Sequence, residues 1–327
     1  MADRGDPSRH MSARIVYIGA PEVPAALFQR RAQADFEGLD LLASDDRQAA
    51  VRELATTEVI IGHHFHFDEA VLASAPRLRW IQSLTSGTDA ILKLRNLPRE
   101  VIVTNTRGMH GPQVSELVFL QMLALLRDFP RMQRNQAAAH WERWPQPLLQ
   151  GKTVVIVGVG AIAEALALRC KAFGMTVHGV SGRSGQLEHF DGLHDYGRLA
   201  YAASLADFLV LLVPLSPATE KLADARLIGA MKPGAYLINV ARGGVLDEEA
   251  LLLALRERRL AGAALDVYRT APLPAEHPLW REPRVVLTPH NGGMSDIYFE
   301  QAYPLVRDNL RLYLDGRPEA LINVVAH

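Results

Sequence analysis

The chain has 327 residues, enough for two domains of about 150 residues each and for a sizeable core. Hydrophobic residues make up 49% and charged residues 22%, which excludes long disordered segments and collagen-like repeats. The 35 Lys and Arg nearly balance the 36 Asp and Glu, for a net charge of -1. We therefore expect no nucleic-acid partner and no broad basic surface for membranes.

The single cysteine and the N-terminal sequence give an expectation for the cellular compartment of the protein. Cys170 is the only cysteine, so no internal disulfide can form, as is typical of a reducing compartment. No apolar run approaches the roughly 18 residues of a membrane span, and the polar N-terminus lacks the apolar core of a secretion signal. His10-Met11 before Ser12 is typical of a cloning junction, so residues 1–11 are left out of the fold prediction. The chain is expected to be cytoplasmic.

Short apolar segments alternate with helical patterns in the first third of the chain. Buried strands are predicted at residues 14–19, 59–62, 78–82 and 101–104. A helix is predicted over 68–75 and is ended by Pro76. This alternation predicts a parallel sheet with helices on both faces.

A long apolar helix, predicted over 113–127, and a polar stretch, 128–150, precede a second series of strands. These strands are predicted at residues 153–157, 176–180, 208–213, 235–240, 263–267 and 285–288. A last helical pattern at 296–314 either returns the chain to the first sheet or covers the second, and periodicity does not decide between the two. The predicted fold class is α/β, with two doubly wound parallel-sheet domains.

A glycine-rich turn follows the first strand of the second series. Gly158 permits a tight turn, Gly160 lets the backbone approach a pyrophosphate, and Ala163 suits helix–strand packing. The next helix is predicted to run to about residue 173, with Gly174 beyond its C-terminus. Strand, turn, helix and next strand follow the order of a dinucleotide-binding motif. The cofactor is expected on Gly158, Val159, Gly160, Ala161 and Ile162.

The end of the next strand distinguishes the two nicotinamide cofactors. An NAD site usually places Asp or Glu there, on the ribose 2′-hydroxyl. This chain has Ser181, Arg183 and Ser184 instead, and no acid. Arg183 can pair with a 2′-phosphate, and both serines can donate hydrogen bonds to it. We therefore predict that NADP(H) is preferred and that NAD(H) is possible. The alternative for Arg183 is a solvated loop residue.

Several further runs are characteristic of one family. They are Val103-Thr104-Asn105, His110-Gly111-Pro112, Met231-Lys232-Pro233-Gly234, Ile238-Asn239-Val240-Ala241-Arg242-Gly243-Gly244, Leu265-Asp266-Val267, His277-Pro278-Leu279-Trp280 and Thr288-Pro289-His290. Over nearly its whole length after residue 12, the chain resembles the D-isomer-specific 2-hydroxyacid dehydrogenases, in particular their glyoxylate/hydroxypyruvate reductase branch.

The resemblance implies a nested arrangement of the two domains. Residues 12–110 and 297–327 form a flavodoxin-like substrate domain, and residues 111–296 form a Rossmann cofactor domain inserted in it, with the active site in a cleft between them. This favours the return of the last helix to the first domain. A homodimer is also implied, with 128–150 near the subunit contact. Trp141 and Trp144 either pack at that contact or edge the pocket.

The resemblance also implies a reaction, hydride transfer between NADP(H) and a small 2-oxo acid such as glyoxylate or hydroxypyruvate. Arg242 holds the carboxylate and carbonyl oxygens, and the backbone N–H groups of Ser86 and Gly87 hold the other side of the carboxylate. His290 donates the proton to the carbonyl oxygen, and Asp266 orients the nicotinamide carboxamide. Further cofactor contacts are expected at Pro214, Thr219, Val240, Ala241, Arg242, His290 and Gly292.

One residue departs from the family pattern. The resemblance places a catalytic glutamate immediately before a proline, where this chain has Ala271 before Pro272. Without that carboxylate we expect His290 to be protonated less readily near neutrality, unless another group such as Glu276 replaces it. Three explanations stay open: a slower or acid-shifted reductase, a different substrate, or a regulatory, corepressor-like protein that keeps the cofactor fold.

A histidine-rich segment, His63-His64-Phe65-His66, follows the strand at 59–62. Closely spaced histidines suggest a metal site, but no cysteine or acid cluster supports one, and adjacent side chains on extended backbone point apart. We predict no metal and expect a loop that lines the substrate cleft, because ligands gather at the carboxyl ends of such strands. His63 is then a substrate-binding candidate, with His64 as the alternative.

Overall fold

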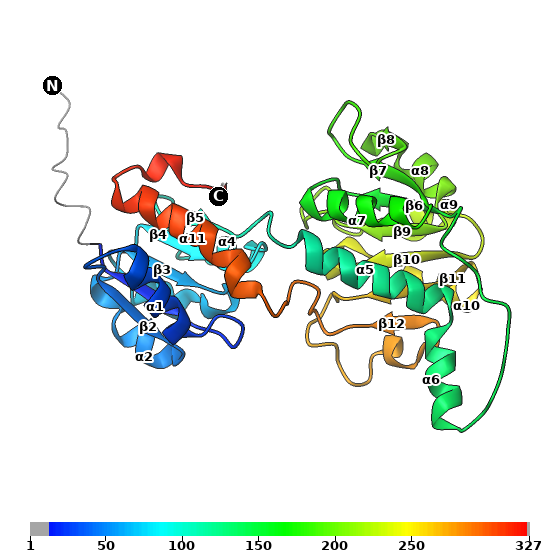
Figure 1. The fold of residues 1–327 in the computed structure, drawn as a ribbon, viewed down its shortest axis with the longest axis horizontal. Helices are drawn as coiled ribbons and strands as arrows, with labels where there is room; N and C mark the ends of the chain where they lie inside the picture. Colours follow the sequence, from blue (N-terminus) through cyan, green and yellow to red (C-terminus); the bar gives the residue numbers. More distant parts are fainter. Residues whose placement is uncertain (1–12, 326–327) are drawn as a thin grey trace. The chain divides into compact units, whose positions relative to one another are not determined.

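The computed structural model describes residues 13–325, so the cloning-junction interpretation of residues 1–11 concerns residues outside this range. The described chain forms two units, residues 13–109 with 294–325 and residues 110–293. Each unit is built on its own sheet (Figure 1). The predicted fold class, two α/β domains with parallel sheets, is confirmed.

The first unit contains a six-stranded sheet in the order β13-β5-β4-β3-β1-β2. Its strands are β1 (Ile15–Ile18), β2 (Leu41–Ser44), β3 (Val59–Gly62), β4 (Trp80–Ser83), β5 (Ile102–Thr104) and β13 (Val324–Val325). All pairs are parallel except β13 with β5. β2 and β13 lie outside the predicted strands. Both are edge strands and neither is fully buried, so neither shows the apolar run of a central strand.

Helices cover both faces of the first sheet. They are α1 (Ala25–Asp35), α2 (Arg47–Arg52), α3 (Glu69–Ala73), α4 (Asp89–Leu92) and α11 (Tyr298–Leu314), with 3-10 turns η2 (Leu54–Thr56), η3 (His64–His66) and η7 (Pro318–Ala320). α1 and α11 pack on one face, where Phe28 and Val306 are buried beside Tyr17 of β1. The other face packs against α2 and α3. Of the two placements that the sequence left open for the last helix, the structure has the one on the first sheet.

The second unit contains a seven-stranded, wholly parallel sheet in the order β12-β11-β10-β9-β6-β7-β8. Its strands are β6 (Thr153–Val157), β7 (Thr176–Val180), β8 (Gly192–His194), β9 (Phe208–Leu211), β10 (Ala235–Asn239), β11 (Leu260–Leu265) and β12 (Val285–Leu287). β8 was not predicted, because it is a half-buried edge strand of three residues. The strand order reverses between β6 and β9, and ligands bind at the carboxyl ends of strands at such a switch point.

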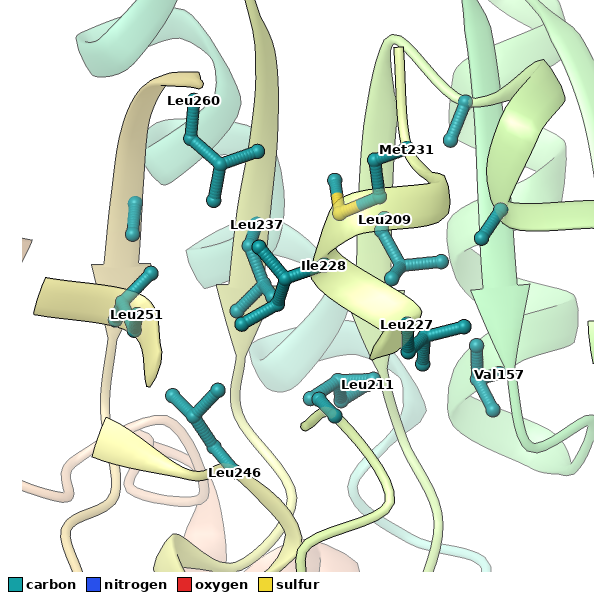
Figure 2. Close-up of a cluster of buried hydrophobic side chains, with 14 of the residues drawn as sticks. Val157, Leu209, Leu211, Leu227, Ile228, Met231, Leu237, Leu246, Leu251 and Leu260 are labelled. Atoms are coloured by element: carbon teal, nitrogen blue, oxygen red, sulfur yellow. The ribbon is translucent and has the colours of Figure 1, made fainter. Parts of the chain in front are cut away.

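Two helical layers enclose the second sheet. The helices are α5 (Gly111–Leu126), α6 (Phe129–Ala137), α7 (Ala161–Ala172), α8 (Leu199–Leu205), α9 (Ala225–Ala230) and α10 (Glu248–Arg256), with 3-10 turns η4 (Tyr196–Arg198), η5 (Gly243–Val245) and η6 (Pro278–Arg281). α5 and α7 pack on one face and α8, α9 and α10 on the other. Figure 2 shows the second layer, in which Leu227 and Ile228 of α9 lie against Leu209 and Leu237 of the sheet. Full burial of each such side chain contributes about 1.5–3 kcal/mol.

The border between the units falls at the start of α5. His110 precedes α5 and its carbonyl accepts the N–H of Val114, so it belongs with the second unit rather than the first. Residues 294–296 belong with the first unit. Among residues 13–325, no helix combines the length and the hydropathy needed to cross a bilayer.

Candidate active site

The glycine turn lies at the switch point of the second sheet, between β6 and α7. Gly158 has a φ of 97°, and a Cβ there would lie 2.8 Å from the Leu212 backbone, so only glycine fits. Gly160 is the N-cap of α7, makes no side-chain cap and has open space where a Cβ would stand. The N–H groups at the start of α7 can therefore hold a phosphate, and these residues fit a dinucleotide. The helix ends as predicted, with Gly174 at a φ of 70° beyond it.

The end of β7 forms a hydrogen-bonded turn. Ser181 is buried, its N–H donates to the His194 carbonyl at 3.0 Å, and its Oγ accepts the N–H of Arg183 at 3.0 Å. Ser184 is exposed. The Arg183 guanidinium is paired rather than simply solvated, because its Nη1 donates to Glu164 Oε1 of α7 at 2.7 Å. Sequence motifs did not single out Glu164.

The loop after β9 is shaped by the hydroxyl of Thr219. Its Oγ1 donates to the Pro214 carbonyl at 2.6 Å and accepts the N–H of Ser216 at 2.8 Å. Pro214 and Thr219, both predicted to contact the cofactor, are thus held together at the switch point. Val240 follows β10 and packs partly buried against the core.

Arg242 follows β10 in a turn that Asn239 shapes. The buried Asn239 accepts the N–H of Ala241 at 3.1 Å and donates its Nδ2 to the Arg242 carbonyl at 3.1 Å. The Arg242 guanidinium also donates to the Ala241 carbonyl at 2.7 Å. A Cβ on Gly243 would overlap the backbone of Tyr268. The turn therefore packs against the chain that leaves β11, and Arg242 stands at the carboxyl edge of the sheet.

Asp266 holds the segment that carries His290. Its carboxylate, on a residue only 2% exposed, accepts hydrogen bonds from Thr288 Oγ1 at 2.6 Å, from the Asn291 N–H at 3.1 Å and from the Gly292 N–H at 2.9 Å. His290 has a φ of 56°, in the left-handed region. A Cβ on Gly292 would crowd the Asp266 carboxylate at 2.9 Å. Bonds before and after His290 thus maintain its backbone conformation.

Burial makes His290 a weak base. Burial lowers its pKa below the ordinary value; the nearby Asp266 carboxylate opposes this change, and the Arg242 guanidinium adds to it. The neutral imidazole is therefore favoured near neutral pH. A lowered pKa of the histidine is the change expected at a site that lacks the catalytic glutamate implied by the family resemblance.

Ala271, in place of that glutamate, is exposed, as is Glu276, the proposed replacement. A carboxylate that does contact this loop is Glu248, at the start of α10. Its Oε1 accepts the N–H of Arg269 at 2.8 Å, and its Oε2 lies 3.5 Å from Nε2 of His277. Glu248 therefore braces the loop, a role that sequence spacing did not indicate because the contact crosses from helix to loop.

His110 is a further residue near Arg242 in electrostatic terms. Its sequence motif indicated no chemical role. Burial and the Arg242 guanidinium lower its pKa to about 4. A Cβ on Gly293 would lie 2.9 Å from the His110 ring, and one on Gly111 would lie 3.4 Å from the Ala161 carbonyl at the start of α7. A neutral imidazole thus lies within electrostatic reach of Arg242, next to Gly111, which packs on the start of α7.

In the first unit, the predicted anion-binding loop follows β4. Asn105 Nδ2 donates to the Ser86 carbonyl at 3.0 Å, and Thr85 Oγ1 donates to the Gly87 carbonyl at 3.0 Å. In a trans peptide the Gly87 N–H points opposite to the Ser86 carbonyl, hence away from Asn105. His64 Nδ1 lies 3.1 Å from Thr85 Oγ1. The loop is therefore braced by side chains that hold its carbonyl groups.

His63 is buried at the carboxyl edge of the first sheet, with 3% of its surface exposed. Its ring stacks at 5.7 Å from that of Tyr298, whose hydroxyl donates to the Leu84 carbonyl. His63 is therefore linked through Tyr298 to Leu84, the residue before the predicted anion-binding loop. Within residues 13–325 no group of three or more His, Cys, Asp or Glu side chains is arranged to hold a metal.

A glycine turn at the switch point of a parallel sheet, with an Arg, an Asp and a His at the same edge, defines the second unit as the dinucleotide-binding domain of an oxidoreductase. The sequence model for the D-isomer specific 2-hydroxyacid dehydrogenase NAD binding domain matches residues 119–292. The chain belongs to this family.

Comparison with individual proteins identifies the branch of the family in which the chain lies. Glyoxylate/hydroxypyruvate reductase A of Serratia proteamaculans is 35% identical over 230 residues, 67% of this chain and 72% of the relative. A D-isomer specific 2-hydroxyacid dehydrogenase family protein of Aeromonas salmonicida has a similar solved structure, with a TM-score of 0.87, 32% identity and coverage of 96% of this chain and 99% of that one. An NADPH-dependent glyoxylate/hydroxypyruvate reductase of Sinorhizobium meliloti, solved with NADP and sulfate, has a TM-score of 0.82, 27% identity and coverage of 96% and 98%. The chain lies in the glyoxylate/hydroxypyruvate reductase-like branch.

Proposed function

We propose that the protein is an NADP(H)-preferring reductase of a small 2-oxo acid of the glyoxylate or hydroxypyruvate type. The observation that carries this proposal is that Asp266 holds His290 within electrostatic reach of Arg242, at the sheet edge where the phosphate turn begins. A proton donor and a fork of cationic N–H groups are what the protein itself would contribute to reduction of an anionic carbonyl compound, the hydride coming from the cofactor.

Cofactor binding is assigned to the turn and to the end of β7. The N–H groups of residues 158–162 would hold the pyrophosphate, and Arg183 with Ser181 and Ser184 would hold the 2′-phosphate. Asp266 would also accept a hydrogen bond from the nicotinamide carboxamide, since each carboxylate oxygen has more than one lone pair. When bound, the reduced nicotinamide supplies the hydride that the substrate carbonyl carbon accepts.

Substrate chemistry is assigned to Arg242, His290 and the backbone of the loop after β4. Arg242 binds the carboxylate and polarises the carbonyl oxygen, and the N–H groups of Ser86 and Gly87 bind the second side of the carboxylate. Protonated His290 gives its proton to the carbonyl oxygen, which becomes the hydroxyl group of a 2-hydroxy acid. In the reverse direction neutral His290 accepts that proton.

NADPH and NADH oxidation, followed with glyoxylate, hydroxypyruvate and longer 2-oxo acids across pH, tests the assignment. We expect turnover with a higher kcat/KM for NADPH than for NADH. The rate of reduction should rise toward acid pH, because the pKa of His290 is lowered and the protonated form is the donor. Tight NADPH binding without turnover on any 2-oxo acid would overturn the proposal.

Ala271 favours a second candidate, a cofactor-binding regulatory protein of the corepressor type with weak or no turnover. The chain has an alanine where the resemblance expects the catalytic glutamate. The same kinetic panel separates the two candidates, since a regulatory protein binds NADPH or NADH and turns over none of the acids.

We also propose that the protein is a homodimer that uses α6 and the stretch after it. Trp141 is 89% exposed, an unusual state for a large aromatic side chain. Trp144 is covered by Arg131, whose guanidinium lies 4.3 Å from its ring and is paired with Glu142. Light scattering on the purified protein should give twice the mass of one chain, and Trp141→Ser should shift the mass toward the monomer.

A further inference from the structure

Glu164 is a charged residue of the second unit to which the proposed function assigns no role. It lies in the first turn of α7, directly after the packing residue Ala163. Its Oε1 accepts a hydrogen bond from Nη1 of Arg183 at 2.7 Å, and both side chains are about half exposed. The guanidinium that is expected to hold a 2′-phosphate is therefore already engaged by a carboxylate.

For two reasons, the Glu164 carboxylate opposes binding of a 2′-phosphate to Arg183. A 2′-phosphate carries between one and two negative charges near neutrality and seeks the same N–H fork that Glu164 occupies. Like charges brought onto one guanidinium also repel each other. A nucleotide with a 2′-hydroxyl carries no such charge and leaves the ion pair intact.

We propose that Glu164 is a specificity-determining residue that competes with the 2′-phosphate for Arg183 and so limits the preference for NADP(H) over NAD(H). This inference rests on the proposed cofactor site. NADP(H) binding exchanges the Arg183–Glu164 pair for an Arg183–phosphate pair, whereas NAD(H) binding does not.

The purely structural alternative makes a different prediction. Acidic residues in the first turn of a helix interact favourably with the helix dipole, and exposed ion pairs add little to stability. If Glu164 has only that role, its replacement changes the melting temperature slightly and leaves the discrimination between nucleotides unchanged.

The test measures ligand binding and does not depend on turnover. Calorimetric titration of the full chain with adenosine 2′,5′-bisphosphate and with 5′-AMP gives a dissociation constant for each ligand. For Glu164→Gln we expect the bisphosphate to bind about three- to fivefold more tightly, as the loss of a competing exposed ion pair allows. Binding of 5′-AMP should stay within about twofold of wild type.

Two variants complete the experiment. Glu116→Gln removes the α5 acid of another ion pair to α7, in which Glu116 lies 3.3 Å from Arg169 of α7, and should leave both dissociation constants unchanged. In an Arg183→Ala background, Glu164→Gln should change bisphosphate binding less than it does in wild type, because the contested guanidinium is gone.

Weaker bisphosphate binding by Glu164→Gln, or an unchanged ratio of the two dissociation constants, overturns the inference. If wild type binds neither nucleotide, the cofactor site and the inference fail together. If the ratio changes as expected but no 2-oxo acid is reduced, the inference stands and only the proposed reaction fails.

Discussion

The Asp266 carboxylate accepts hydrogen bonds from the backbone of the two residues that follow His290. Its Oδ1 accepts the N–H of Asn291 at 3.1 Å and its Oδ2 accepts that of Gly292 at 2.9 Å. The same carboxylate counteracts, electrostatically, the effect of burial on the pKa of His290. The residue expected to orient the nicotinamide therefore also positions the proposed proton donor and adjusts its acidity.

Asp266→Asn keeps the size of the side chain and removes its charge. Because the carboxylate raises the pKa of His290, we expect a further lowered pKa and a kcat for 2-oxo acid reduction reduced about 10- to 100-fold near neutral pH. Steady-state rates across pH should show the profile displaced toward acid. Asp315→Asn, at the exposed end of α11, is the matched control. A profile that keeps its wild-type midpoint would contradict this role.

Ala271→Glu restores the acid that the family resemblance places at this position. A carboxylate beside His290 favours the imidazolium, and each unit of pKa increase gives up to about tenfold more of the protonated donor above the pKa. We expect kcat for glyoxylate reduction to rise about tenfold near neutral pH. Ala271→Gln, of equal size but uncharged, should not show the gain. An unchanged or lower rate in Ala271→Glu argues against the missing carboxylate as the cause of weak protonation.

Arg242→Lys keeps the charge and removes the planar fork. A charge-assisted hydrogen bond is worth about 1.5–3 kcal/mol, so we expect kcat/KM for the 2-oxo acid to fall about 10- to 100-fold. The dissociation constant for NADPH, followed by protein fluorescence, should stay within about threefold of wild type. A loss confined to NADPH binding would show that Arg242 contacts the cofactor alone and does not hold the substrate.

His110 links stability to pH. In the unfolded chain a histidine takes up a proton near pH 6.5, whereas burial and Arg242 lower the pKa of His110 in the folded protein to about 4. The contribution of His110 to the free energy of unfolding is therefore fully present above about pH 6.5 and falls by up to about 3 kcal/mol as the pH drops to about 4. His110→Asn, which does not titrate, should lose less stability over this range.

Urea unfolding at about pH 7 and about pH 4.5 measures the difference between wild type and His110→Asn. Burial also lowers the pKa of His66, His178 and His194, and these groups titrate in both proteins, so the comparison isolates the contribution of His110. Equal losses of stability in the two proteins would show that His110 is not the responsible group.

Local patterns predicted most of the second unit. The strand, the glycine turn and α7 could be read from the sequence because the turn needs Gly158 at a positive φ and the helix ends before Gly174. The edge strands β2, β8 and β13 were not predicted. They are short and partly exposed, and their hydrogen bonds to neighbouring strands, rather than an apolar run, make them strands.

By itself, the sequence determined the order of the central strands, the glycine turn and the residues at the strand ends, because apolar periodicity and glycine positions are local properties. Only the tertiary structure decided that α11 covers the first sheet, that Glu164 engages Arg183, and that the charge of Arg242 acts on His110. Such contacts depend on strand order and crossovers that bring distant segments together. The acidity of a histidine depends on burial and on distances to charges, which no sequence pattern records.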